Sequence, residues 1–71
     1  IIGTYWRNKK HQTNYRIEAI GIDCNNNVEV NKSGLTVLYR NQVDNSLIFT
    51  RSLDEFLVKF SYIPNGGSEN V

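Results

Sequence analysis

The strand expected over residues 15–23 constrains the fold most, because its apolar side chains alternate along the chain and then change phase. Tyr15, Ile17 and Ala19 alternate with charged residues, as in a strand that is buried on one face only. The two isoleucines that flank Gly21 then place apolar side chains on the opposite parity. A phase change beside a glycine predicts a β-bulge or a sharp bend. Small barrels need such bends to close, so this segment predicts a strongly curled sheet.

The rest of the chain supplies further strands and one helix start. Strands are expected over residues 4–7, 28–30, 35–40, 47–51 and 59–63. The polar turn at residues 41–46 predicts an antiparallel hairpin. Ser52 and Glu55 fit a capping box, in which the serine accepts a backbone hydrogen bond and the glutamate reaches back. We therefore predict a mainly β fold, a small antiparallel barrel or strongly curled sheet with one short helical turn near residues 52–58.

Length and composition indicate one small domain. We expect it to span residues 1–63, with a flexible C-terminal tail over residues 64–71 that is rich in Gly, Asn and Ser. A core this small is only marginally stable, so we expect a homo-oligomer joined through an exposed strand edge. Cys24 is the single cysteine and cannot form an internal disulfide. We expect a cytoplasmic protein with no cofactor, no metal site and no membrane segment.

The net charge of +1 argues against a general duplex-DNA binder. The charge is uneven, however, because basic residues crowd the first quarter of the chain. They are Arg7, Lys9, Lys10, His11 and Arg16. This run could track a phosphate backbone, or it could be a solvated loop.

Arginines and aromatic residues supply the candidate binding groups. Arg40 and Arg51 could converge on a phosphate or carboxylate. They could instead pair with Asp44, Asp54 or Glu55, or stay solvated. We expect the two arginines to lie side by side if the sheet curls enough. The aromatic residues that could stack a base, or instead form the core, are Tyr5, Trp6, Tyr15, Tyr39 and Phe49. The candidate ligand-binding residues are therefore Trp6, Arg7, Lys10, Tyr39, Arg40 and Arg51.

No catalytic residues are expected. His11 lies in a polar loop, and the sequence offers neither an oriented nucleophile nor a third group beside it. Cys24 has no basic neighbour in the sequence that would activate its thiol. We therefore predict that the protein is not an enzyme.

Short motifs extend from Gly3 to Phe56. They are Gly3-Thr4-Tyr5, Lys10, Tyr15-Arg16-Ile17, Val37-Leu38-Tyr39-Arg40 and Phe49-Thr50-Arg51-Ser52-Leu53. Together they resemble a family of small bacterial and phage domains of unknown function, with the pattern G-x-Y-x-H-x-K, Y-x-V, V-V-Y-R and W-x-R-P-x-x-x-F. This chain has Arg7, Phe49 and Ser52 where that pattern has His, Trp and Pro. The resemblance implies a compact SH3-like β barrel and no established activity.

Two functions remain open at this stage. The first is a non-enzymatic module that binds a nucleotide or short nucleic acid; the phage resemblance suggests a protein that sequesters a nucleotide signal of host defence. The alternative is a protein-interaction module, such as a phage inhibitor of a host enzyme, that uses a sheet edge. A cleft shared by Trp6, Arg40 and Arg51 would favour the first. Fully paired arginines beside an exposed apolar patch would favour the second.

Overall fold

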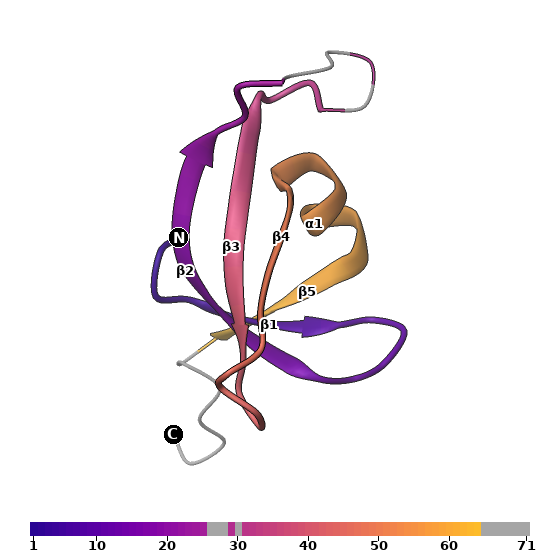
Figure 1. The fold of residues 1–71 in the computed structure, drawn as a ribbon. Coiled ribbons are helices and arrows are strands. Elements are labelled where there is room, and N and C mark those ends of the chain that lie inside the picture. The colour runs from indigo at the N-terminus through magenta and orange to yellow at the C-terminus, as the bar shows by residue number, and fades with distance from the viewer. Residues whose placement is uncertain (26–28, 30, 65–71) are drawn as a thin grey trace.

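The computed structural model describes residues 1–25, 29 and 31–64. Its elements are β1 (Tyr5–Asn8), β2 (Asn14–Ile22), β3 (Leu35–Asn41), β4 (Ile48–Ser52), α1 (Leu53–Lys59) and β5 (Phe60–Ile63). The five strands form one antiparallel sheet in the order β4-β3-β2-β1-β5, curled into a half-barrel (Figure 1). The prediction of a mainly β, strongly curled fold with one short helix is confirmed.

Two predicted segments fall largely outside the described residues. The strand expected over residues 28–30 does so except for Glu29, and the tail expected over residues 64–71 does so except for Pro64. The remaining strands lie where the sequence patterns place them, to within one or two residues.

The helix spans the open side of the half-barrel. Since α1 follows β4 and precedes β5, it joins the two edge strands of the sheet. Figure 1 shows β2, β3 and β4 running side by side, with β1 and β5 turned across them and α1 on the side of β4 that β5 also occupies. The helix therefore covers the concave face.

The phase change in β2 is a β-bulge. The ladder between β2 and β3 pairs Ile17 with Tyr39 and then shifts, which leaves Glu18 as an extra residue on β2. The extra residue returns Ile20 to the same face as Ile17, where it packs against the core. The predicted bulge is therefore present. It lies before Gly21, which keeps a regular place in the ladder.

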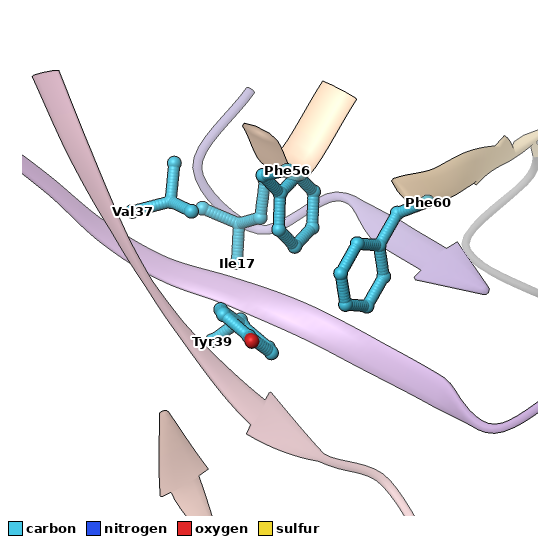
Figure 2. Close-up of a cluster of buried hydrophobic side chains, with 5 residues drawn as sticks. All are labelled: Ile17, Val37, Tyr39, Phe56 and Phe60. Carbon is cyan, nitrogen blue, oxygen red and sulfur yellow. The ribbon is translucent and has the colours of Figure 1, made fainter. Parts of the chain in front are cut away.

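The core lies between the concave face and α1. Its buried hydrophobic side chains are Ile17, Val37, Tyr39, Phe56 and Phe60 (Figure 2). The rings of Phe56 and Phe60 stack with their centroids 4.1 Å apart, and both contact the ring of Tyr39. Trp6 reaches the same cluster from β1 and meets Phe56 edge-on, with centroids 5.4 Å apart. Phe56 is thus the side chain through which α1 docks on the sheet.

The helix begins at the predicted cap. The Ser52 hydroxyl accepts a hydrogen bond from the Glu55 backbone N–H at 3.2 Å, which satisfies one of the free donors at the helix start. The predicted second half of the capping box is not formed, because the Glu55 carboxylate pairs with Arg51 instead of reaching back to the Ser52 backbone N–H. The Asp54 carboxylate accepts a hydrogen bond from the Ser33 backbone N–H at 3.0 Å, which ties the helix to the loop before β3.

Candidate functional site

A pocket of about 420 Å³ opens beside the core, between the β1–β2 turn, β4 and the end of α1. Such a volume is typical of small-molecule sites. The aromatic residues that line it are Tyr15, Tyr39, Phe49 and Phe60. The centroid of the Tyr15 ring lies 5.3 Å from that of Tyr39 and 6.2 Å from that of Phe49. Tyr39 and Phe60 are buried, whereas Phe49 is 42% exposed. The core aromatic cluster therefore continues to the surface as the floor of this pocket.

Basic side chains surround this floor. Lys9, Lys10 and His11 come from the β1–β2 turn, Lys59 comes from the last turn of α1, and Arg51 comes from β4. Among the described residues that line the pocket, none carries a carboxylate. The pocket therefore combines an apolar aromatic floor with a positively charged rim.

Local hydrogen bonds hold the basic turn against the helix. The Asn8 side-chain oxygen accepts hydrogen bonds from the backbone N–H groups of Lys10 and His11, at 2.9 and 2.8 Å. This is the turn geometry that asparagine favours. The Lys9 backbone N–H donates to the Lys59 carbonyl at 2.9 Å. The three lysines consequently come from segments that are joined through their backbones.

Arg51 is held from several sides. Its Nε donates a hydrogen bond to the Tyr39 hydroxyl at 3.2 Å, and its Nη1 lies 2.7 Å from Glu55 Oε1. The guanidinium also lies over the Phe60 ring, 5.9 Å from its centroid. The hydrogen bond to Tyr39, with that to Glu55, raises the pKa of Arg51 above its ordinary value, although burial opposes this shift. Arg51 is thus a positioned cation with one carboxylate already beside it.

Three of the six predicted ligand-binding residues line this pocket: Lys10, Tyr39 and Arg51. Trp6 instead packs against Phe56 and Tyr62, and its indole N–H donates to the Thr4 hydroxyl at 2.9 Å.

Arg7 and Arg40 also lie away from the pocket. Arg7 follows Trp6 on β1, so its side chain leaves the opposite face, where its Nε donates to the Asn14 side-chain oxygen at 2.8 Å. Arg40 donates to the Asn45 carbonyl at 2.6 Å.

Arg40 and Arg51 do not lie side by side, contrary to the expectation from the sequence. Arg51 lies opposite Val37, whose side chain is in the core, so Arg51 belongs to the concave face. Arg40 follows the buried Tyr39 directly and therefore points to the convex face, where its Nε lies 3.6 Å from Glu18 Oε2. Curling cannot join side chains that leave opposite faces of the sheet.

Several pocket residues were not among the six predicted. Lys9 and His11 belong to the basic run that the sequence showed, and Tyr15 and Phe49 were weighed as a stacking platform. Lys59 carried no signal, because only the pairing of β5 with β1 brings it to the β1–β2 turn.

The structure does not decide between a nucleotide-binding module and a protein-interaction module. Trp6, Arg40 and Arg51 share no cleft, and both arginines have carboxylate partners. An apolar stretch is exposed at the start of β4, where Leu47, Ile48 and Phe49 are each more than 40% exposed. These observations favour a protein partner, whereas the basic aromatic pocket favours an anionic ligand.

Comparison with family profiles, with curated proteins and with solved structures finds no match for this chain. The resemblance of its short motifs to a family of small domains stays a prediction. Among the described residues, no group of three or more His, Cys, Asp or Glu side chains could hold a metal ion. The described part of the chain also contains no helix with the length and apolar character needed to cross a membrane.

Proposed function

We propose that the protein is a non-enzymatic binding module whose pocket takes an anionic aromatic ligand, a nucleotide or the end of a short nucleic acid. The observation that supports this most is the union of an aromatic floor with a basic rim, in which no described lining residue carries a carboxylate. Bases stack on exposed aromatic rings, and phosphates pair with lysine and arginine. Phe49 offers the exposed ring, and Lys9, Lys10 and Lys59 offer the cations.

The lack of carboxylate partners for the rim lysines among the described residues supports an anionic ligand. Among the described residues, none of the three lysine ammonium groups pairs with a carboxylate. Of the two carboxylates in the first turn of α1, Glu55 pairs with Arg51 and Asp54 accepts from the Ser33 backbone, so neither pairs with a lysine. The rim therefore keeps a local positive charge although the whole chain carries only +1.

We propose that binding is not followed by chemistry. His11 is the rim side chain best suited to proton transfer near neutral pH, and within the described residues its ring has no hydrogen-bonding partner that would orient it. A pocket that holds a nucleotide without converting it fits the sequestration of a nucleotide signal in the bacterial cytoplasm, which the phage resemblance suggests by analogy.

A titration with defined ligands tests the proposal. AMP, a cyclic mononucleotide and a short single-stranded oligonucleotide would be screened by thermal shift, because a ligand of the folded state raises Tm. We expect at least one of them to bind, with an affinity that falls as salt rises. Phe49→Ala should weaken binding by about 1–3 kcal/mol through lost stacking.

Matched lysine variants separate the pocket from general charge. Replacing Lys9 or Lys10 by glutamine should weaken binding about two- to fivefold for each lysine. Lys32→Gln removes the same charge from an exposed position that does not line the pocket and should leave the affinity unchanged. Equal losses for Lys32 and the rim lysines, or no Tm shift with any of the three ligands, would refute the proposal.

A protein partner is the second candidate function, and the exposed edge of β4 favours it. β4 is an edge strand of the sheet, so its outer backbone groups face away from β3. Leu47, Ile48 and Phe49 add exposed apolar surface there. Such an edge suits pairing with an extended segment of a host protein or with a second copy of the chain. Homo-oligomerisation through this edge stays a prediction.

A further inference from the structure

A carboxylate of the same chain lies beside the pocket, although it does not line it. The Glu55 carboxylate lies 2.7 Å from Nη1 of Arg51, the arginine that lines the pocket. The Glu55 side chain is 50% exposed, and that of Arg51 is 30% exposed. An ion pair this accessible to water is weak, so a ligand anion can compete with it.

The two partners are restrained to different degrees. Arg51 keeps two other contacts, the hydrogen bond from its Nε to Tyr39 and its position over the Phe60 ring. The backbone N–H of Glu55 is fixed by the Ser52 hydroxyl, but its carboxylate has Arg51 as its hydrogen-bonding partner among the described residues and can otherwise turn to solvent. Loss of the pair therefore releases Glu55 and leaves the Arg51 guanidinium in place.

We propose that Glu55 is a displaceable internal counter-ion, which occupies Arg51 in the free protein and yields it to a phosphate group of the ligand. The inference rests on the proposed anion-binding function of the pocket and names the group that regulates it. A terminal phosphate group carries a charge of about −1.5 to −2 near neutral pH and has three acceptor oxygens, so it pairs with Arg51 more strongly than one carboxylate does. Glu55 then acts as a competitor that lowers the affinity of the pocket for every anion.

The experiment measures the binding of inorganic phosphate by NMR, with the Arg51 Nε–H signal as the reporter. That proton is donated to Tyr39 and lies beside the proposed phosphate position. Glu55→Gln removes the competing charge but keeps the backbone N–H that Ser52 caps. We expect phosphate to bind this variant about two- to sixfold more tightly than it binds the unmodified protein, the range that a solvent-exposed ion pair allows.

Two further variants distinguish displacement from a general change of charge. Asp54→Asn removes one charge from the neighbouring helical position, whose carboxylate is bound to the Ser33 backbone, and should change the affinity less than twofold. In an Arg51→Gln background, the backbone N–H signals of Lys10 and His11, which line the pocket, replace the lost arginine signal as reporters, and Glu55→Gln should no longer tighten binding. The inference is overturned if Glu55→Gln leaves the affinity unchanged, if its gain persists without Arg51, or if phosphate leaves the Arg51 signal unmoved in every variant that keeps Arg51.

This outcome is separate from that of the proposed function. Binding of AMP that depends on Lys9, Lys10 and Phe49 supports the nucleotide pocket even if Glu55 proves irrelevant. Conversely, phosphate can displace Glu55 in a pocket that binds no nucleotide. Melting temperatures of all variants, measured without ligand, identify any variant whose binding changes because its fold is damaged.

Discussion

Replacement of Phe56 by alanine should remove a large part of the stability of this domain. Phe56 is fully buried, and its ring centroid lies 4.1 Å from that of Phe60, 5.1 Å from that of Tyr39 and 5.4 Å from that of Trp6. Truncation of a buried phenylalanine to alanine costs about 3–5 kcal/mol. Because the side chain touches three other rings, we expect about 4 kcal/mol. A chain of 71 residues has a total stability of only about 4–10 kcal/mol.

Urea unfolding measures this cost, and the protein contains its own reporter. Trp6 is the only tryptophan, and it meets Phe56 edge-on, so its fluorescence follows the docking of α1. Phe56→Ala also changes the surroundings of Trp6 in the folded protein and hence its native fluorescence. The transition should therefore be followed by far-UV circular dichroism as well, as a probe that does not depend on Trp6. The midpoint should fall, with little change in the slope of free energy against urea concentration.

Leu57→Ala is the matched control. Leu57 is the next residue of α1 and is 46% exposed, so its truncation should cost no more than about 0.5 kcal/mol. The conservative variant Phe56→Leu keeps an apolar side chain in place and should cost clearly less than Phe56→Ala. A cost below about 1 kcal/mol for Phe56→Ala, or an equal cost for Leu57→Ala, would show that α1 does not dock through Phe56.

Two further predictions concern the helix cap and a turn. Ser52→Ala should lower the free energy of unfolding by about 1 kcal/mol, measured by urea, because it removes the acceptor for the Glu55 N–H. Hydrogen bonds from the Ser46 hydroxyl and backbone N–H lower the pKa of Asp44 in the folded protein. The stability that they contribute is therefore fully present above the ordinary aspartate pKa of about 3.9. It is lost as the pH falls through the lower pKa of the folded state. Ser46→Ala should therefore raise the Asp44 pKa in an NMR titration, and its stability deficit at pH 7 should disappear in acid.

The local features of this fold were predictable because nearby residues determine them. A serine three residues before a glutamate defines a helix start without reference to the rest of the chain, and α1 begins there. The change of apolar parity in β2 likewise requires an extra residue, whatever the neighbouring strand is. The sequence did not determine the position of that residue, since only the pairing of Ile17 with Tyr39 and of Ala19 with Leu38 identifies Glu18 as the bulge.

The placement of the two arginines shows what the sequence left undetermined. The structure pairs Tyr39 with Phe49 and Val37 with Arg51 across the β3–β4 hairpin. In this register, odd-numbered residues of both strands share the concave face, which puts Arg51 inside and Arg40 outside. A register shifted by one residue would have placed both arginines on one face. The conformation of the turn at residues 41–47 sets that register, and the composition of the turn alone does not predict it.

The positive charge of the pocket could not be predicted from the net charge of the sequence, because the fold separates carboxylates from lysines. A net charge of +1 suggests a surface with little preference for anions. The fold, however, places Glu18 between Arg16 and Arg40 on the convex side and keeps Glu55 on Arg51. Pairing of β5 with β1 then brings Lys59 to the basic turn, across about fifty residues of sequence. Because long-range pairing sorts carboxylates from lysines, the sign of a small site does not follow from the sum over the chain.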